Sequence, residues 1–396
     1  MVLDRDTVIG VVGAGAMGSG IAQVAAAAGH RVILGDVARG ATQKAQATIG
    51  KAMEREVQKA RMSRDAADEV MSRIDYQWEP LGDDLANYNA CGFTIEAITE
   101  DLAAKQALFR RLEASIAPDA VLATNTSSLS VASIASACNA PQRVVGVHFF
   151  NPAPVLPLVE VIPWMGGEPS LTPAIHALMQ RWSKTPVIAS DTPGFIVNRI
   201  ARPFYGEAIR LLEEGIADVA TIDIAMKELG GFRMGPFELM DFIGNDVNYA
   251  VTKSVFEGFF YDPRYRPSLT QRRLVESGFL GKKSGRGYYD YRDAVETPVA
   301  SRDPKLATNI FERILAMLIN EAVDAVYMRV ASPDDIDLAM TKGVNYPKGL
   351  LAWGNEVGLP RVLGWLEPLQ AEYGEDRYRP SPLLRRMVRD NRRFFE

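Results

Sequence analysis

The segment that most constrains the fold is VIGVVGAGAMGSGIAQVAAAAGHRVILGDV, residues 8–37. It places three glycines in G-x-G-x-x-G spacing after a β-branched run and at the head of an Ala-rich helical run. In such a turn Gly13 permits the tight bend, Gly15 lets the backbone approach a pyrophosphate, and Gly18 lets helix and strand pack closely. The N–H groups at the helix N-terminus attract the phosphates. The pattern predicts a dinucleotide-binding unit, against the alternative of a glycine-rich turn without a ligand. The residues expected at the cofactor here are Gly13, Gly15, Ala16, Met17 and Gly18.

Asp36 ends the second strand of this unit, eighteen residues after Gly18. A carboxylate at this position accepts hydrogen bonds from the ribose hydroxyls and repels a 2'-phosphate, which favours NAD over NADP. No arginine follows directly, although Arg39 lies close by and keeps NADP as the alternative. The predicted cofactor is NAD.

Short β-branched runs alternate with helical segments from residue 7 to about residue 190. Strands spaced by helices in this way predict βαβ units and a parallel sheet. After DTPGF, residues 191–195, the strand runs vanish and helical patterns dominate. We therefore predict an α/β Rossmann-type N-terminal domain over residues 1–190, followed by an all-α C-terminal region. The expected strand runs are TVIGVV, RVILGD, GFTIEAI, AVLATN, RVVGVHF, LVEVI and PVIAS.

Composition and charge argue against several classes of partner. Of the 396 residues 47% are hydrophobic and 23% are charged, as in a globular protein with more than one core. A formal net charge of −5 offers no basic footprint for nucleic acid or an anionic membrane. No apolar run is long enough to predict a membrane span, and the first strand begins too early to leave room for a signal peptide. Cys91 and Cys138 are too few for a disulfide framework, so we expect structural thiols and a cytoplasmic location.

His148 and Glu160 interrupt VVGVHFFNPAPVLPLVEVIP, residues 144–163, which otherwise has the pattern of buried strand broken by an Asn-Pro-x-Pro turn. His148 ends a strand at the edge where a doubly wound sheet meets its ligand. A hairpin-like return would bring the Glu160 carboxylate to the imidazole, and a hydrogen bond between them would offset the cost of burying the carboxylate. The glutamate would then fix the tautomer and stabilise the imidazolium as His148 accepts a proton.

Beside an NAD site, such a pair suits the oxidation of an alcohol, in which hydride leaves for the nicotinamide while a base removes the hydroxyl proton. The Cys and His spacing of a catalytic zinc site is absent, so no metal is expected. His30 and His176 are not expected to take part in catalysis.

Five motifs stand in order over roughly the first 290 residues: GAGAMGSGIAQVAAAAGHRVILGD, IEAITEDLAAKQALFRRLE, ATNTSSLS, VHFFNPAPVLPLVEVI and DTPGFIVNRI. Together they resemble the L-3-hydroxyacyl-CoA dehydrogenases of β-oxidation-type pathways, in which they occur in the same order. The resemblance implies that His148 is the catalytic base and Glu160 its partner. It also implies that Ser127 and Asn198 hydrogen-bond the substrate oxygens near the reacting carbon. If the resemblance is set aside, the alternative is that Ser127 caps a helix and that Asn198 forms hydrogen bonds only within its own helix.

The same resemblance places further residues around the two ligands. Lys59 is expected to reach a CoA phosphate, because a point charge on a long stem suits that task. A solvated helix face with Arg55 and Arg61 is the alternative for Lys59, and ordinary solvated charges are the alternative for Glu100 and Lys105. The residues implied around the dinucleotide are Asp36, Glu100, Lys105, Asn151 and Lys283.

Two segments of the helical region repeat each other. EAIRLLEEGIADVATIDIAM, beginning at Glu207, returns as EAVDAVYMRVASPDDIDLAM, beginning at Glu321, an offset of 114 residues. Asp223 and Asp337 keep that offset, and DPRYRPSLTQRRLVE returns as EDRYRPSPLLRRMVR. A match of this length predicts two repeated helical modules, over residues 191–295 and 304–396.

The two copies differ at the position of Asn198, because the second copy has Glu312 there. The second module is therefore expected to be structural, closing the substrate cleft or forming a subunit interface. Apolar helices such as IFERILAMLINEAVDAVYM need a partner surface, and the family commonly dimerises through these domains, so we expect a homodimer.

The predicted function is NAD-dependent oxidation of an L-3-hydroxyacyl-CoA to the 3-oxoacyl-CoA, in fatty-acid or phenylacetate-type β-oxidation. The duplicated form resembles bacterial enzymes that act on 3-hydroxyadipyl-CoA or 3-hydroxybutyryl-CoA, and the sequence leaves the acyl group open. One alternative is a dehydrogenase of a free hydroxy acid or sugar acid. The other is a nucleotide-binding scaffold without turnover.

Overall fold

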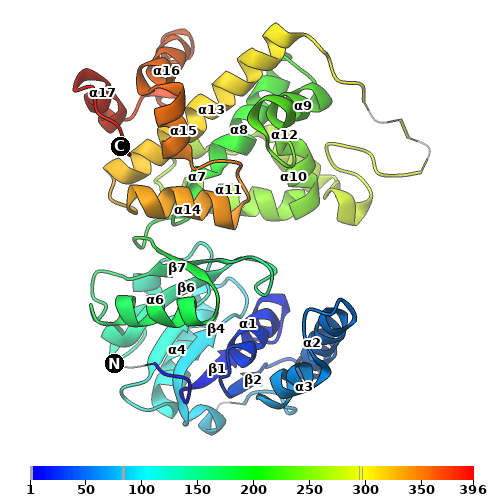
Figure 1. Cartoon of the computed structure of the whole chain (residues 1–396), viewed down its shortest axis with the longest axis vertical. Helices are drawn as coiled ribbons and strands as arrows, with labels where there is room; N and C mark the ends of the chain where they lie inside the picture. The colour runs from blue at the N-terminus through cyan, green and yellow to red at the C-terminus, as the bar shows by residue number, and fades with distance from the viewer. Residues whose placement is uncertain (1–2, 83–84, 294, 297) are drawn as a thin grey trace. The chain divides into compact units, whose positions relative to one another are not determined.

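The computed structural model describes residues 3–82, 85–293, 295–296 and 298–396. Two compact units divide the chain, Met1–Thr192 and Pro193–Glu396. Figure 1 shows strands and helices in the first unit and helices in the second. The predicted fold class, a Rossmann-type α/β domain followed by an all-α region, is confirmed. Among the described residues, no helix is long and apolar enough to cross a membrane.

The first unit is built on one eight-stranded sheet in the order β3-β2-β1-β4-β5-β6-β7-β8. Neighbouring strands run parallel except β6 and β7, which pair antiparallel. The strand order reverses at β1, which lies between β2 and β4. In doubly wound sheets the ligand binds at the carboxyl ends of the strands at this point. The strands are β1 (Val8–Val12), β2 (Val32–Gly35), β3 (Ile74–Tyr76), β4 (Cys91–Glu96), β5 (Val121–Thr124), β6 (Val144–Phe149), β7 (Leu158–Ile162) and β8 (Thr185–Ile188).

Helices of the first unit begin where the sequence supplies a cap or a glycine turn. Ser63, Asp101 and Ser130 each accept a backbone N–H of the following first turn, which satisfies a donor that the helix itself leaves unpaired. The first helix instead begins at the glycine-rich turn, and its alanine-rich face is buried in the core. The helices are α1 (Ala16–Ala27), α2 (Ala41–Gln58), α3 (Arg64–Ser72), η1 (Ala86–Tyr88), α4 (Leu102–Ser115), α5 (Val131–Ala135), η2 (Pro141–Arg143) and α6 (Leu171–Arg181).

The sheet contains one strand that was not expected and one antiparallel return that was. Strand β3 was not expected, because the three residues Ile74–Tyr76 are too short a run to show a period. In a sheet that is otherwise parallel, β7 returns antiparallel to β6 through the turn that contains a cis Asn151–Pro152 peptide bond. This return is the hairpin-like geometry expected for the segment that holds His148 and Glu160.

The second unit consists of helices joined by turns and loops, among them a long connection between η4 and α13. Its longest helix, α13, packs against α8, α9, α15, α16 and α17. The elements are α7 (Val197–Ile200), α8 (Arg202–Glu213), α9 (Val219–Gly230), α10 (Pro236–Ile243), α11 (Asn245–Gly258), η3 (Pro263–Tyr265), α12 (Leu269–Glu276), η4 (Lys282–Ser284), α13 (Pro304–Tyr327), α14 (Pro333–Gly343), α15 (Leu350–Val357), α16 (Leu359–Tyr373), η5 (Asp376–Tyr378) and α17 (Pro382–Arg389).

The series α9 to α12 recurs as α14 to α17, with matching local contacts. Asp223 in α9 accepts hydrogen bonds of 2.9 Å from two backbone N–H groups at the start of α10. Asp337 in α14 accepts hydrogen bonds of 2.8 and 2.9 Å from two N–H groups at the start of α15. In both copies a glycine, Gly235 or Gly349, lies so close that a Cβ would be 2.3 Å from the aspartate side chain. The repeat in the sequence therefore corresponds to a repeat of structure.

The contacts that α7 and α8 make with α13 are reciprocal. Arg199 donates from Nε to Glu321 at 2.6 Å. The residues that match them in the other copy, Arg313 and Glu207, make the same contact at 2.5 Å. A tyrosine completes each pair: Tyr265 donates to Glu321 at 2.6 Å and Tyr378 donates to Glu207 at 2.7 Å. Reciprocal contacts of this kind are the signature of a two-fold interface, here formed between two segments of one chain.

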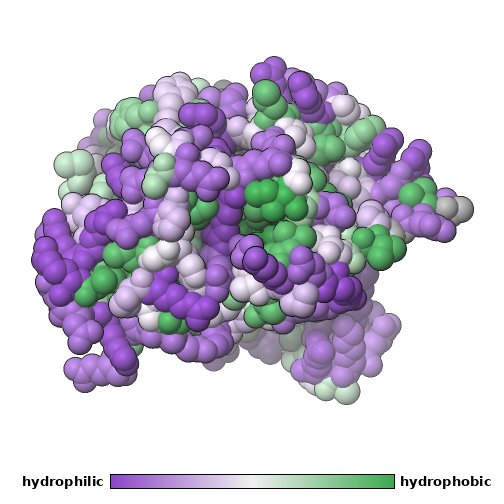
Figure 2. All heavy atoms as spheres, turned by 90° about the horizontal axis from the view of Figure 1, so that it is seen from above, coloured by the Kyte–Doolittle hydropathy of each residue, from purple (hydrophilic) through white to green (hydrophobic). Residues whose placement is uncertain are grey.

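Figure 2 shows a face with mostly hydrophilic residues and smaller groups of hydrophobic residues between them. Exposed large hydrophobic residues of the second unit include Phe242, Phe260 and Leu269. Scattered apolar residues of this kind are normal on a folded surface.

Candidate active site

The glycine-rich turn after β1 has the geometry that its three glycines predict. Gly13 has φ +105°, and a Cβ there would lie 2.4 Å from the Ala97 carbonyl oxygen. A Cβ on Gly18 would lie 1.7 Å from the Gly13 carbonyl oxygen, so α1 packs on the turn only because this residue is glycine. At Gly15 no atom lies within 4 Å of the Cβ position, which leaves the backbone open to an approaching group. The turn therefore fits the pyrophosphate of a dinucleotide.

Asp36 is tied to this turn by its own carboxylate. One oxygen accepts the Ala14 N–H and the other accepts the Ala38 N–H, both at 2.7 Å. The side chain is half-buried at the end of β2, beside the turn. These two hydrogen bonds hold the carboxylate in place at the position expected for a ribose-binding acid.

A buried ion pair lies under the next two strand ends. The Lys105 ammonium donates to Glu96 at 2.5 Å and lies 3.2 Å from Glu100. Glu96 also accepts the Thr124 hydroxyl at 2.7 Å, which links the carboxyl end of β4 to that of β5. The Lys105 side chain is 1% exposed and the Glu96 side chain is 0% exposed. Lys105 was expected at the dinucleotide; it lies beneath the surface here, and its contact with a ligand stays a prediction.

Glu100 organises the turn that carries Ser127. One of its oxygens accepts hydrogen bonds from the Ser127 N–H at 2.8 Å and hydroxyl at 3.2 Å. The hydroxyls of Thr126 and Ser128 donate to the same oxygen, at 2.7 and 3.0 Å. Burial raises the pKa of Glu100, but the Lys105 charge and these hydrogen bonds outweigh burial and hold its pKa below the usual range. Glu100 is thus an ionised acceptor that fixes the Ser127 turn.

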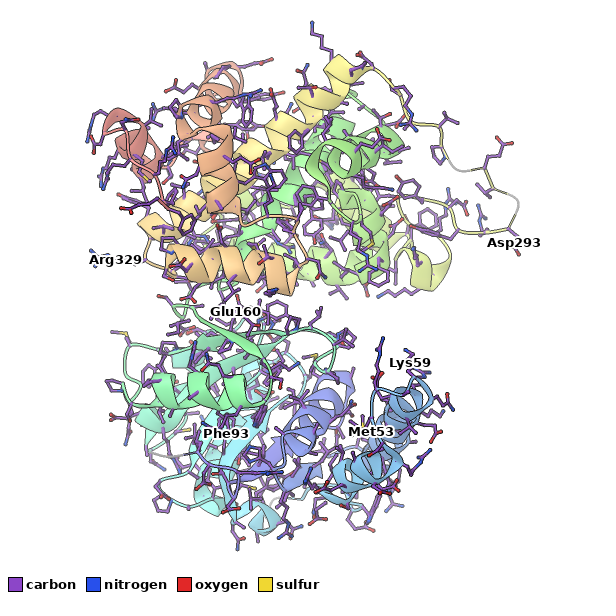
Figure 3. All side chains as sticks on the ribbon, viewed as in Figure 1. Met53, Lys59, Phe93, Glu160, Asp293 and Arg329 are labelled. Atoms are coloured by element: carbon purple, nitrogen blue, oxygen red, sulfur yellow. The ribbon has the colours of Figure 1, made fainter. Side chains whose placement is uncertain are left out.

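His148 and Glu160 lie directly opposite each other in the antiparallel pair of β6 and β7. The imidazole Nδ1 is 2.6 Å from Glu160 Oε2. Glu160 is 0% exposed, and His148 is also buried, with its ring 4.5 Å from the Phe150 ring. Figure 3 labels Glu160 in the sheet of the first unit. The two side chains that the sequence predicts to pair are therefore brought together by strand register.

Several polar residues at this edge of the sheet were missed in the sequence. Asn125 accepts the Phe149 N–H at 2.8 Å and so joins the ends of β5 and β6. Asp191 accepts hydrogen bonds from two N–H groups and the Ser130 hydroxyl at the start of α5. Glu96 is an acid in the apolar run GFTIE, and that pattern, the same one that drew attention to Glu160, could have identified it.

Other predicted site residues are placed as follows. Lys59 directly follows α2 and is exposed. Figure 3 labels it at the end of that helix. Asn151 is exposed in the turn after β6. In the second unit Asn198 is half-buried in α7, and its carbonyl accepts Arg202 Nε at 2.7 Å. Lys283 forms an ion pair of 2.6 Å with Asp246.

His30 and the two cysteines have structural environments. His30 Nδ1 lies 2.9 Å from the Thr7 carbonyl oxygen, and burial lowers the pKa of this histidine. Burial raises the pKa of Cys91 to about 12 and that of Cys138 to about 11. In the part of the chain that the structure describes, no group of three or more His, Cys, Asp or Glu side chains is arranged to hold a metal ion.

Comparison with known families matches both units. The NAD-binding domain model of 3-hydroxyacyl-CoA dehydrogenase matches residues 8–192. The C-terminal domain model of the same enzyme matches residues 194–291 and 310–393. The chain belongs to the 3-hydroxyacyl-CoA dehydrogenase family. It is accordingly an NAD-dependent oxidoreductase.

Relatives with similar sequences and structures carry names of this family. The chain is 38% identical to 3-hydroxyadipyl-CoA dehydrogenase of Escherichia coli K12, over 95% of this chain and 96% of the relative. It is 40% identical to 3-hydroxybutyryl-CoA dehydrogenase of Bradyrhizobium diazoefficiens, over 73% of this chain and 97% of the relative. A crystal structure of 3-hydroxybutyryl-CoA dehydrogenase from E. coli K12 superposes with a TM-score of 0.90, at 38% identity and covering 98% of each chain.

The carboxylate of Asp36 has a testable part in NAD binding. We expect Asp36→Ala to weaken NADH binding about tenfold or more, because hydrogen bonds to a charged group contribute about 1.5–3 kcal/mol. The same change removes the charge that repels a 2'-phosphate, so the preference for NADH over NADPH should fall as well. Fluorescence titration with both nucleotides measures the two effects. An unchanged ratio of the two dissociation constants would contradict this role of Asp36.

Proposed function

We propose that this chain oxidises an L-3-hydroxyacyl-CoA to the 3-oxoacyl-CoA with His148 as general base and Glu160 as the residue that orients it. The observation that carries the proposal is the 2.6 Å contact between His148 Nδ1 and the buried Glu160 carboxylate at the carboxyl end of β6. Because Glu160 engages Nδ1, the proton of the substrate hydroxyl goes to Nε2. A carboxylate held against Nδ1 stabilises the imidazolium that forms.

NAD, when bound, accepts the hydride that leaves the carbinol carbon. The substrate loses a hydride from the carbinol carbon and a proton from its hydroxyl oxygen. The CH–OH group thereby becomes a C=O group, and the two electrons leave with the hydride. The residues around the glycine turn fit this cofactor, since Gly15 leaves its backbone open and Asp36 is fixed beside it. We assign Glu100, Lys105, Asn151 and Lys283 to the surroundings of the dinucleotide.

Two further residues are proposed to hydrogen-bond the substrate oxygens near the reacting carbon, Ser127 and Asn198. Support for Ser127 comes from its turn, which Glu100 fixes through the Ser127 N–H and hydroxyl. We assign Lys59 to a CoA phosphate, supported by its exposed position beyond α2.

We propose three domains: residues 1–190 bind NAD, residues 191–295 form the helical domain that contacts substrate, and residues 304–396 form a degenerate copy. Glu312, which replaces Asn198 in the second copy, forms an ion pair of 2.7 Å with Arg361. A carboxylate engaged in this way is not an amide available to a substrate, which supports a structural role for the second copy.

The acyl group, pathway and assembly are also proposals. The names of the E. coli relatives support 3-hydroxyadipyl-CoA or 3-hydroxybutyryl-CoA as substrate, and hence phenylacetate-type or fatty-acid β-oxidation in the cytoplasm. We retain the homodimer as a proposal. Since α8 is already paired with α13 in the same chain, a dimer would use other surfaces.

The decisive experiment follows NADH absorbance with acetoacetyl-CoA and with short, long and dicarboxylic 3-hydroxyacyl-CoA substrates. The proposal expects turnover of CoA thioesters and none of the corresponding free acids. Turnover of a free hydroxy acid or sugar acid at a higher kcat/KM would favour the alternative dehydrogenase. No turnover of any member, with NADH binding intact, would favour a nucleotide-binding scaffold.

A further inference from the structure

A pocket in the helical unit concentrates positive charge, and none of the residues assigned to catalysis lines it. It has a volume of about 320 Å³ and is lined by residues of α8, α11, α12 and the turns around η3 and η5. Three arginines line it, against one carboxylate, Glu213. Behind its wall a fourth arginine, Arg202, donates to the Thr252 hydroxyl at 3.0 Å. The arginines of the lining are Arg210, Arg266 and Arg377.

The internal repeat supplies a comparison for Arg377, because Arg264 occupies the matching position in the other copy. Arg264 is 2.7 Å from Asp324 and 3.0 Å from Asp262, with Glu321 at 3.8 Å. For Arg377 the nearest carboxylate in an ion pair is Glu375, 3.8 Å from Nε. Within the described part of the chain, the buried Nε of Arg377 has no hydrogen-bond partner.

The missing partner of Arg377 can be identified from the repeat. Asp324, which neutralises Arg264, is matched in the other copy by Arg210. Beside Arg377, a second guanidinium thus stands where the other copy has a carboxylate. Arg210 itself forms an ion pair of 3.0 Å with Glu375. Burial lowers the pKa of Arg377 and Arg210 lowers it further, against the opposite effect of Glu207 and Glu375. Arg377 is 7% exposed, and a buried charge without a close counter-ion is costly.

Space for a counter-ion exists at the same place. In the other copy Asn320 fills the matching position, where its amide donates to the Arg379 carbonyl at 3.0 Å and its oxygen accepts the Ser381 N–H at 2.7 Å. The residue that matches Asn320 is Gly206, which lines the pocket. A Cβ on Gly206 would meet no atom within 4 Å, so the space that Asn320 takes up in one copy is open in the other.

We propose that this pocket binds the phosphate group of a small metabolite, held by Arg210, Arg266 and Arg377. The phosphate oxygens supply the negative charge that Asp324 supplies to Arg264 in the other copy. Guanidinium groups present planar pairs of N–H donors that match phosphate oxygens, and a dianion suits two converging arginines better than a single carboxylate does. The pocket volume leaves room for the organic part of the ligand. This proposal is independent of the substrate assigned above.

Titration calorimetry tests the site with inorganic phosphate and pyrophosphate as probes, at constant ionic strength. The protein is kept saturated with NADH, so that the dinucleotide site does not bind the probe. We expect saturable binding that weakens about tenfold or more in Arg377→Gln, because a hydrogen-bonded charge pair is lost. Arg272→Gln is the matched control, since Arg272 lies on α12, is exposed and pairs with Glu276. It should bind the probes like the wild type.

A second variant reproduces the arrangement of the other copy. Arg210→Asp places a carboxylate where Asp324 lies relative to Arg264, so we expect a folded protein that no longer binds the probes. If Arg377→Gln fails to fold, Arg266→Gln at the exposed rim takes its place, with the same expected loss. Unchanged affinity in Arg210→Asp and in the foldable arginine variant would overturn the site. Tighter binding of citrate than of pyrophosphate would overturn the assignment to phosphate.

Discussion

Replacing His148 with glutamine lowers turnover by about two orders of magnitude or more, while NADH still binds. Glutamine cannot take the hydroxyl proton, and a positioned acid-base group contributes about 10²–10⁴-fold to the rate. The glycine turn and Asp36 are untouched by the change, so the cofactor site remains. Steady-state kinetics with acetoacetyl-CoA give the loss of turnover, and fluorescence titration gives NADH affinity. Glu160→Gln keeps the shape of the side chain but removes its charge, so it should lower turnover with NADH affinity unchanged.

His176 provides the matched control for this prediction. It is half-buried on α6 and was not expected to take part in catalysis. His176→Gln should keep turnover within about twofold of the wild type. A substitution outside the core and outside buried hydrogen-bond networks usually has little effect on stability. Turnover like that of the wild type in His148→Gln would remove His148 from the mechanism.

Replacing Arg313 with methionine is expected to lower the free energy of unfolding by about 3–5 kcal/mol, the cost of breaking a buried ion pair. Arg313 donates to Glu207 at 2.5 Å, and the change leaves the buried Glu207 carboxylate without its main cation. Tyr378 still donates to Glu207, but a neutral hydroxyl does not neutralise the carboxylate. Urea unfolding measures the loss in the full chain.

Two companion variants show whether the pairing itself is responsible. Arg313→Met combined with Glu207→Leu removes both charges, and apolar replacement of a whole buried pair is often neutral or stabilising, so much of the loss should be recovered. Arg361→Met removes an arginine that is 63% exposed and pairs with Glu312, and should cost about 1 kcal/mol or less. If Arg313→Met costs no more than Arg361→Met, the reciprocal contacts between α8 and α13 contribute little to stability.

The predictable parts of the candidate site are those that depend on short sequence distances. The glycine turn and Asp36 belong to one strand–helix–strand unit, so their spacing predicts their geometry, and the structure has Asp36 accepting the Ala14 N–H. His148 and Glu160 are twelve residues apart across one turn, and a hairpin was enough to predict that they meet. Contacts across separate strands were not predictable in this way. Glu96 with Thr124, and Glu100 with Ser127, depend on the registers of β4 and β5, which no local pattern specifies.

The sequence by itself determined the class of fold, the cofactor type and the existence of two similar helical modules, because glycine spacing, strand periodicity and repeated motifs are local properties. Tertiary structure decided that Lys105 is buried under the sheet edge with Glu96, and that Arg199 and Arg313 reach across to the acids of the opposite module. It also decided that Arg210 replaces a carboxylate beside Arg377. Charges attract whichever partner the packing of helices and strands brings near, and that packing is set by the burial of the whole core.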